Sequence, residues 1–406
     1  MLQIPSEYIL ALQEVLSVDL SNEGLRSVRG REFIGRTADS VMKLSHGLTR
    51  ERAGFASSKY LNDPKIREAY LCYYTTTNLL KIWPPLRELS LSGFFVNRTE
   101  LRQLDIGTGT GAAVWGLATY LMQEQPSITK LVVEATDSLN KNLKTVEGFG
   151  ARLQNHLKPL SIAIKVSGLD LSLRSDRANA LHTQHDVITL MNVLNEVDES
   201  LDDEIIAMLR IRLADDGAIV MIEPASREES RRALRFRDRM VRAGFFVHAP
   251  CCKTGSCPAL AVPDNWCHTE VPWQRPDFIK EIDDHTGTLR LSLKSTYSVY
   301  LKKDLNLSDR RSSSRDFVEV GRVVSERFDE KGRVRLFVCN ELGRREFIMN
   351  KRDKSPMNAD ALKTERFDLV QMSGMEERNH DVKIGGEAVF HTLFSAEGCE
   401  NVDKPG

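Results

Sequence analysis

Apolar residues recur every three or four positions through the first 95 residues, which predicts a region of amphipathic helices. One predicted helix, DPKIREAYLCYYTTTNLLKIW, can be capped by Asn62 or Asp63, with Pro64 in its first turn. We expect it to end at three residues, Trp83, Pro84 and Pro85. We interpret its tyrosines as core residues rather than ligand contacts, and they are Tyr70, Tyr73 and Tyr74.

From about residue 100 to residue 225 the pattern changes to short apolar runs separated by helical segments. This alternation is typical of a parallel sheet wound with helices, which is an α/β fold. The predicted strands are 101–106, 131–135, 162–166, 187–191 and 218–222.

Strand-like segments return beyond an arginine-rich helix and a cysteine-rich run, in LRLSLKSTYSVYLKK, FVEVGRVVSE, GRVRLFVC and REFIMNK. They predict a small β domain, in which LNLSDRRSSSRD is an exposed loop. The pattern therefore divides the chain into a helical region (1–95), an α/β domain (96–245), a cysteine-rich loop (246–284), a β domain (285–373) and a weakly periodic tail (374–406).

The composition of the chain indicates its cellular compartment more clearly than its function. A net charge of -1 gives no overall attraction to nucleic acid, so any such contact must come from local basic patches. No run approaches the roughly 18 apolar residues of a membrane span. The first thirty residues are also too acidic for a mitochondrial transit peptide. We therefore expect a soluble monomer in a bacterial-type cytoplasm, with the mitochondrial matrix as the alternative.

The run LDIGTGTGAA places Asp105 at the end of a predicted strand and three glycines, Gly107, Gly109 and Gly111, before an apolar helix. Glycines there let a tight turn bring backbone amides and the helix N-terminus against a ligand. The loop lacks the GxGxxG spacing of dinucleotide folds and the Lys-Ser/Thr of a P-loop. We therefore predict a Rossmann-like S-adenosylmethionine methyltransferase fold.

Polar residues follow the other predicted strands. Asp137 ends the second strand, where a carboxylate can accept hydrogen bonds from ribose hydroxyls, and Glu134 is the alternative. Asp170 follows the third strand and could meet the adenine amine or cap a turn. Three polar residues follow the fourth strand at the carboxyl edge of the sheet, where open α/β folds hold ligands, and they are Asn192, Asn195 and Glu196.

Four of the seven cysteines form the pattern Cys251-x5-Cys257-x9-Cys267-x71-Cys339. Clustered thiols in a reducing compartment indicate a metal site rather than disulfides. Irregular spacing without paired CxxC knuckles favours an iron–sulfur cluster over structural zinc. In the alternative zinc site, His268 could replace one thiolate. The other cysteines are interpreted as spares, and they are Cys72, Cys252 and Cys399.

The segment REESRRALRFRDRMVR predicts a helix with an arginine stripe on one face. The stripe consists of Arg231, Arg235, Arg239 and Arg242. It fits a surface that follows RNA phosphates and, equally, a solvated helix face whose charge is partly offset by acidic neighbours.

The order of these features resembles the methyltransferase-like ribosomal small-subunit assembly family, which has mitochondrial and bacterial members. The likeness runs from about Tyr60 to Cys339, through REAYLCYYTTTNLL, LDIGTGTG, NVLNEV, EPAS, APC-x5-CP, NWCH, YSVYLKK and LFVC. The resemblance implies an S-adenosylmethionine pocket around the three glycines, a 4Fe–4S cluster on the four cysteines, and a role in maturing the small ribosomal subunit through its rRNA.

The leading hypothesis is an S-adenosylmethionine-binding, cluster-bearing assembly factor of the small ribosomal subunit. The alternative is an active S-adenosylmethionine-dependent rRNA methyltransferase. The segment MNVLNE lacks the Asn/Asp-Pro-Pro-aromatic run of amine methyltransferases, and no cysteine falls at the sheet edge. No catalytic motif therefore supports methyl transfer. A small-molecule methyltransferase with structural zinc is disfavoured by the arginine helix and the β domain.

Overall fold

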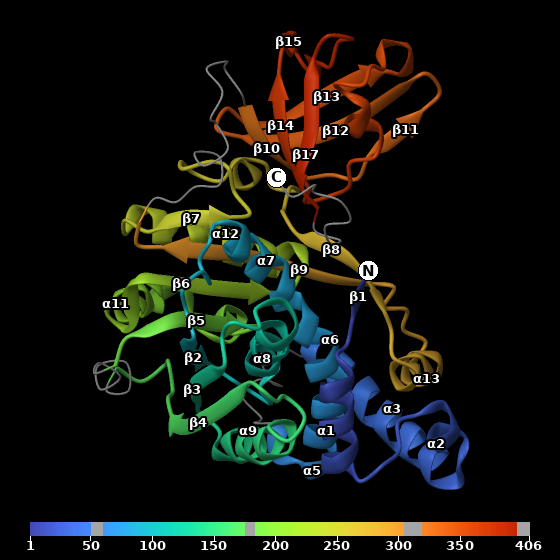
Figure 1. Ribbon diagram of the computed structural model, residues 1–406, viewed down its shortest axis with the longest axis vertical. Coiled ribbons are helices and arrows are strands. Elements are labelled where there is room, and N and C mark those ends of the chain that lie inside the picture. The colour runs from blue at the N-terminus through green and yellow to red at the C-terminus, as the bar shows by residue number, and fades with distance from the viewer. Residues whose placement is uncertain (50–59, 175–182, 304–318, 396–406) are drawn as a thin grey trace. The chain divides into compact units, whose positions relative to one another are not determined.

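The computed structural model describes residues 1–49, 60–174, 183–303 and 319–395 (Figure 1). The chain forms two compact units. We call the first the α/β unit, which contains 2–222 and 272–293, and the second the cysteine unit, which contains 223–271 and the residues from 294 onward. Among the described residues, no helix has the length and apolar character needed to cross a membrane.

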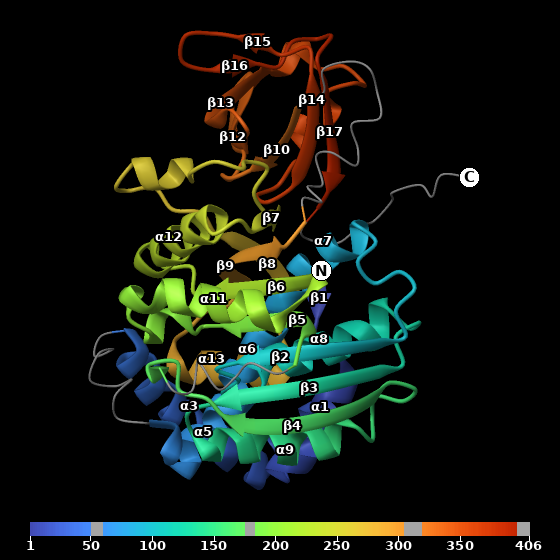
Figure 2. The same cartoon turned by 90° about the vertical axis from the view of Figure 1, so that its left-hand side faces the viewer.

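The α/β unit is built on five parallel strands in the order β4-β3-β2-β5-β6, which Figure 2 shows one above the other. The order reverses between β2 and β5, and α/β folds hold their ligands at such a switch point. All five strands predicted from the sequence are confirmed. Their bounds are β2 (Glu100–Ile106), β3 (Lys130–Asp137), β4 (Ser161–Gly168), β5 (His185–Met191) and β6 (Leu213–Glu223).

Helices pack around this sheet, and a further short parallel pair joins β1 (Leu2–Gln3) to β8 (Thr269–Gln274). The helices that matter below are α3 (Val28–Thr49), α5 (Pro64–Ala69), α6 (Thr76–Leu79), α7 (Trp83–Leu91), α8 (Ala112–Glu124), α9 (Asn140–Leu153), α11 (Asp202–Arg212) and α13 (Asp277–Thr286).

The predicted tyrosine-rich helix is capped as expected but is not continuous. The Asp63 carboxylate accepts hydrogen bonds from the backbone of Lys65 at 2.8 Å and of Ile66 at 3.3 Å, which caps α5. A π-helical segment, η2 (Tyr70–Thr75), then interrupts the α-helix. The prediction that Trp83 and the two prolines end the helix is wrong. They begin α7, because a proline in the first turn loses no helical hydrogen bond.

The cysteine unit contains α12 (Arg227–Arg242), an antiparallel pair of β7 (Phe246–Ala249) with β9 (Ser292–Leu301), the short helix η6 (Pro258–Ala261) and a second sheet. Among the described residues that sheet has the order β15-β16-β13-β12-β10-β14-β17, with β11 beside β12. Its strands are β10 (Glu319–Val323), β11 (Phe328–Glu330), β12 (Arg333–Asn340), β13 (Gly343–Asn350), β14 (Leu369–Ser373), β15 (Glu376–Glu377), β16 (Val382–Lys383) and β17 (Val389–Phe394).

Two boundaries of this sheet differ from those expected from the sequence. The sheet continues to Phe394, because β17 pairs with β14, although residues from 374 were expected to be a tail. The strand β9 was expected in the β domain but pairs with β7. The expected loop LNLSDRRSSSRD, residues 305–316, lies outside the described residues.

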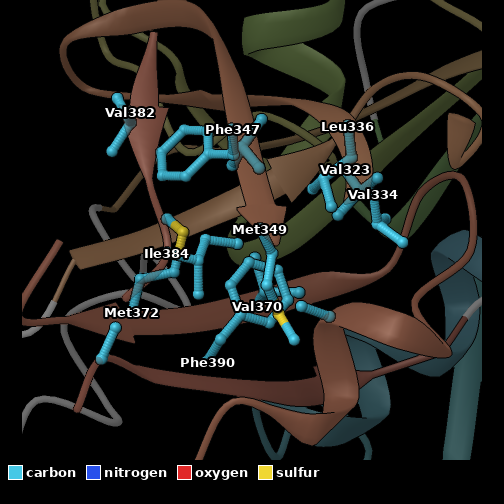
Figure 3. Close-up of a cluster of buried hydrophobic side chains, with 13 residues drawn as sticks. Val323, Val334, Leu336, Phe347, Met349, Val370, Met372, Val382, Ile384 and Phe390 are labelled. Atoms are coloured by element: carbon cyan, nitrogen blue, oxygen red, sulfur yellow. The ribbon is translucent and has the colours of Figure 1, made fainter. Parts of the chain in front are cut away.

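One apolar cluster fills the interior of the second sheet. Figure 3 shows its side chains converging from the strands into a single core. Phe347 on β13 is fully buried there and, with Phe390 on β17, is one of its two phenylalanines. Alternation of buried and partly exposed positions along β12 and β13 places one face of each strand against this core.

We predict that Phe347→Ala lowers the free energy of unfolding of the cysteine unit by about 3–5 kcal/mol, because it leaves a cavity in a packed core. Phe328, which is 41% exposed, provides the control, and Phe328→Ala should cost less than about 1 kcal/mol. Native-state amide exchange in β12 and β13 measures both. Equal protection in the two variants would contradict the assignment of this core.

Candidate functional site

The glycine loop between β2 and α8 requires glycine at three positions for different reasons. Gly107, Gly109 and Gly111 have φ of 67°, 54° and 91°, which other residues rarely adopt. A Cβ on Gly107 would lie 2.7 Å from Val193, and one on Gly111 would lie 2.5 Å from Trp115. A Cβ on Gly109 would meet nothing within 4 Å. Gly109 therefore faces open space, which a ligand can fill.

A pocket opens over this loop at the carboxyl ends of β2 and β5. Four of the residues predicted for cofactor binding line it, and they are Asp105, Gly107, Gly109 and Asn192. Three others do not line it, and they are Gly111, Asp137 and Asp170. Tyr70 and Asn78 from the N-terminal helices complete the wall.

Asp105 presents a carboxylate oxygen to this pocket. Its Oδ1 accepts a 2.6 Å hydrogen bond from the hydroxyl of Thr189. Its buried Oδ2 has no well-aligned hydrogen-bond partner among the described residues, although the Thr108 hydroxyl acts on this carboxyl and lowers its pKa in part. Burial raises the pKa of Asp105 to about 6. Because an unmatched buried oxygen is costly, it favours a ligand that brings a donor or a positive charge.

Asp137 holds the loop in place. Its Oδ2 accepts the N–H of Gly109 at 2.8 Å, and its Oδ1 accepts donors from Leu139 at 2.8 Å and Asn142 at 3.1 Å. Burial nevertheless raises the pKa of Asp137. The alternative to Asp137, Glu134, pairs instead with His185 and Arg212. The hydrogen bond from His185 and the charge of Arg212 lower the pKa of Glu134 to about 2 despite partial burial.

Asp170 and Asn192 occupy different kinds of position. Asp170 accepts hydrogen bonds from the backbone and hydroxyl of Ser172, at 2.9 and 2.6 Å, as a turn cap does. Asn192 has a φ of 60° and donates its N–H to the carbonyl of Ile222 at 2.8 Å. This unusual backbone turns Asn192 into the pocket wall at the end of β5.

The interpretation of all three tyrosines as core residues is wrong for Tyr70. Tyr73 is fully buried, but Tyr70 lines the glycine-loop pocket. The rings of Tyr70 and Tyr74 are stacked with centroids 5.3 Å apart, and Tyr60 lies 6.3 Å from Tyr70. The i, i+4 spacing of Tyr70 and Tyr74 was visible in the sequence, but the π-helical turn that directs them was not.

All four predicted cysteine ligands line one cavity in the cysteine unit. Cys251 follows β7, Cys257 caps η6, Cys267 precedes β8 and Cys339 lies on β12. Cys252 and His268 do not line this cavity, and Cys399 lies outside the described residues. His268 instead stacks on Trp266, and Arg366 donates to its ring at 3.0 Å. Burial and the charge of Arg366 lower the pKa of His268 to about 4.

The cavity disfavours free thiolates. Burial, followed by the proximity of Cys251, raises the pKa of Cys257 to about 12. The same two causes raise the pKa of Cys267 and of Cys339. Four ionised sulfurs can therefore share this cavity only with a compensating positive charge.

A single zinc ion and an iron–sulfur cluster need different arrangements of the sulfurs. Zinc holds thiolates at about 2.3 Å and so brings tetrahedral sulfurs to roughly 3.8 Å from one another. In the described part of the chain, no three His, Cys, Asp or Glu side chains converge as ligands of one ion must. In an iron–sulfur cluster each cysteine binds a different iron, so its sulfurs stand farther apart around a larger volume. The described side chains show that the four cysteines share one cavity, without the close convergence of a single-ion site.

Two buried arginines fix the walls of this cavity. Arg237 donates to the carbonyls of Lys253 and Gly255, between the first two cysteines. Its neighbour Asp238 accepts the N–H of Cys257 at 3.1 Å. On the other side, Arg322 donates to the carbonyls of Pro250 at 2.9 Å and Phe367 at 2.7 Å.

Sequence reasoning missed Arg237, although a signal existed. It lies on the buried face of α12 with Ala233, Leu234 and Met240, at helical spacing. An arginine among apolar residues on a helix face indicates a buried partner. Burial would lower the pKa of Arg237, but the charges of Cys251 and Asp238 raise it overall. Arg237 therefore remains a cation beside the cysteines.

The four arginines of the α12 stripe differ in their surroundings, because Arg231 holds the cysteine loop whereas Arg235 and Arg242 are exposed. The guanidinium of Arg231 donates to four backbone carbonyls of residues 259–265, at distances from 2.8 to 3.3 Å. These bonds hold the segment between Cys257 and Cys267, and they use the donors that a phosphate contact would need. Arg235 and Arg242 are exposed, and Arg239 is partly exposed.

Several methyltransferases of known structure are similar to this chain. A putative class I S-adenosylmethionine-dependent methyltransferase from Listeria monocytogenes is 12% identical, with 74% of this chain and 88% of that one covered and a TM-score of 0.36. A TehB-like S-adenosylmethionine-dependent methyltransferase from Corynebacterium glutamicum is 17% identical, with coverage of 59% and 100% and a TM-score of 0.31.

The glycopeptide N-methyltransferase MtfA, complexed with S-adenosyl-L-methionine, is 10% identical, with 54% of this chain and 93% of that one covered and a TM-score of 0.31. These TM-scores are below 0.5, so the fold assignment depends on the strand order described above. No curated protein matches the chain.

A family match covers more than half of the chain. Residues 95–367 match the family described as mitochondrial small ribosomal subunit Rsm22. The matched segment contains the glycine loop, the arginine helix and all four cysteines of the cavity. The chain therefore belongs to the Rsm22 family.

Proposed function

We propose that this protein is an S-adenosylmethionine-binding assembly factor of the small ribosomal subunit that carries a 4Fe–4S cluster and contacts rRNA. The observation that carries the proposal is that Cys339, far away in the sequence, lines the same cavity as the three clustered cysteines Cys251, Cys257 and Cys267. Membership of the Rsm22 family supports the link to the small ribosomal subunit.

The cluster would be held by Cys251, Cys257, Cys267 and Cys339. When bound, it would supply a covalent link between the cysteine loop and β12 and remove the repulsion among the thiolates. The buried guanidinium of Arg237 would offset part of the remaining negative charge. Its hydrogen bonds, and those of Arg322, orient the backbone that carries the ligands.

S-adenosylmethionine would occupy the glycine-loop pocket. Gly109 leaves the space, Asp105 offers an unmatched carboxylate oxygen and Asn192 closes the edge of the sheet. The cationic ligand would satisfy Asp105 without another protein donor. Methyl transfer is not part of the proposal, because no cysteine is among the pocket-lining residues and MNVLNE carries no proline-aromatic run.

Contact with rRNA would use Arg235, Arg239 and Arg242. They lie on α12 at spacings of three and four residues, which gives them one face, and Arg231 is occupied by the cysteine loop. Phosphate contacts by arginine need no particular base sequence. The proposed surface therefore fits binding to structured rRNA through its backbone.

Cys339→Ala should remove the visible absorbance of the protein purified without oxygen and lower the free energy of unfolding by more than about 4 kcal/mol, because ligand binding and folding are linked. Cys252→Ala is the matched control, since Cys252 is buried beside Cys251 but does not line the cavity. Absorbance spectra and thermal unfolding measure both effects. The cluster assignment fails if the two variants behave alike.

The affinity for S-adenosylmethionine should rise with pH up to about 6, the pKa of buried Asp105, and level off above it. Below that pH the ligand must displace a proton, which costs up to about tenfold in affinity per pH unit. Asp105→Asn should bind weakly and without this pH dependence, whereas the turn cap variant Asp170→Asn should match the wild type. Calorimetry between pH 5 and 8 measures the affinity of the wild type and of both variants for S-adenosylmethionine. An unchanged profile in Asp105→Asn would contradict this role.

Gradient sedimentation with immature small subunits tests the function as a whole. The wild type should comigrate with them. A triple change of Arg235, Arg239 and Arg242 to Gln should reduce the salt slope of binding by about three units, one for each lost phosphate contact. The control changes three other arginines of the cysteine unit, Arg333, Arg352 and Arg378. If the two triple variants lose binding equally, the α12 surface is not the contact.

A further inference from the structure

A second polar cavity lies in the α/β unit, and it shares no lining residue with the glycine-loop pocket. We call it the Arg290 cavity. It is lined by three segments that are far apart in the sequence. Its lining consists of Val41, Met42, Ser45 and His46 from α3, Tyr73 and Tyr74 from η2, and Thr286, Thr288 and Arg290 from α13 and beyond.

Arg290 brings an uncompensated positive charge to this cavity. Its guanidinium lies 4.8 Å from the ring centre of Tyr73 and 5.3 Å from that of Tyr74. Among the described residues no carboxylate pairs with Arg290. Asp283, which accepts a hydrogen bond from Tyr73, is instead paired with Arg275 at 2.9 Å. A half-buried arginine without a counter-ion favours an anionic ligand.

A second basic group, Lys81, does not line the cavity. Burial and the charge of Arg290 lower the pKa of Lys81 to about 7, so it is only partly charged at neutral pH. The preference for an anion therefore depends on Arg290.

A serine and two threonines also line the Arg290 cavity, but the hydroxyl of Thr286 already donates to the carbonyl of Ile282 at 2.9 Å and that of Thr288 to the Asp283 carboxylate at 3.1 Å. The donor for an anion is therefore the guanidinium of Arg290, and arginine is a common partner of phosphate.

The aromatic wall adds a surface for a planar group. Tyr74 is only partly buried, and one side of its ring stacks on Tyr70, which lines the glycine-loop pocket. A nucleobase stacks well on tyrosine, and this contact tolerates any base. We propose that the Arg290 cavity binds a nucleoside phosphate, either free or as a unit of an RNA chain.

The proposal goes beyond the function above, because none of the cavity residues belongs to the cysteine set or to the arginine stripe. Only the version of the proposal in which the ligand is part of an RNA chain rests on the proposed rRNA contact. The shared turn η2 carries Tyr70 and Tyr74, so it joins the wall of this cavity to that of the glycine-loop pocket. Ligands in the two cavities should therefore influence each other.

Calorimetry with the full-length protein tests the proposal. The probes are the four ribonucleoside 5′-monophosphates, the matching nucleosides, inorganic phosphate and a short single-stranded RNA. A monophosphate or the RNA should bind at least about tenfold more tightly than the nucleoside and than phosphate alone. Stronger binding of the RNA than of any monophosphate identifies an RNA chain as the ligand, and the reverse identifies a free nucleotide.

Two pairs of variants keep the test independent of folding. Arg290→Gln should weaken binding at least about tenfold, whereas Arg29→Gln, an exposed change on α3, should not. Met42 is 45% exposed at the rim, so Met42→Glu should fold and repel the phosphate, while Met42→Gln should bind as the wild type does. The absence of binding to every probe, or equal binding by Met42→Glu and Met42→Gln, would overturn the proposal.

Discussion

Four thiols around one buried cavity impose the constraint on which the cysteine unit depends. Burial and mutual proximity raise the pKa of three of them, so ionised sulfurs there would repel one another strongly. The surrounding backbone is held by hydrogen bonds that do not involve sulfur. Arg237, Asp238, Arg322 and Arg231 supply these bonds to the segments that carry the cysteines. The backbone of the cysteine loop is thus held by side chains other than the cysteines themselves.

This arrangement explains why a strongly charged helix has so many roles within sixteen residues. One face of α12 is buried and places Arg237 beside the cysteines. Arg231 turns to the loop between Cys257 and Cys267, and the remaining arginines of the stripe are more exposed. Arginine suits all of these roles because it stays charged and offers five donors. The arginine stripe predicted from spacing alone therefore includes an arginine, Arg231, that holds the cysteine loop rather than facing a ligand.

The sequence predicted the features that depend on local pattern. Buried parallel strands such as β5 and β6 appear as continuous apolar runs, whereas in the more exposed β4 large apolar residues occupy alternate positions. Gly107 marks a turn that only glycine tolerates. Features that depend on tertiary contacts were not accessible. Three features depend on which distant segments meet. They are the place of Tyr70 in the pocket wall, the hydrogen bonds from Arg231 to backbone carbonyls, and the pairing of β17 with β14.

The most direct test of the central claim is a crystal structure of protein purified without oxygen, with diffraction data measured at the iron and zinc absorption edges. The account predicts an iron signal enclosed by the sulfurs of Cys251, Cys257, Cys267 and Cys339. A single zinc signal at those cysteines, or an iron signal elsewhere in the chain, would contradict it.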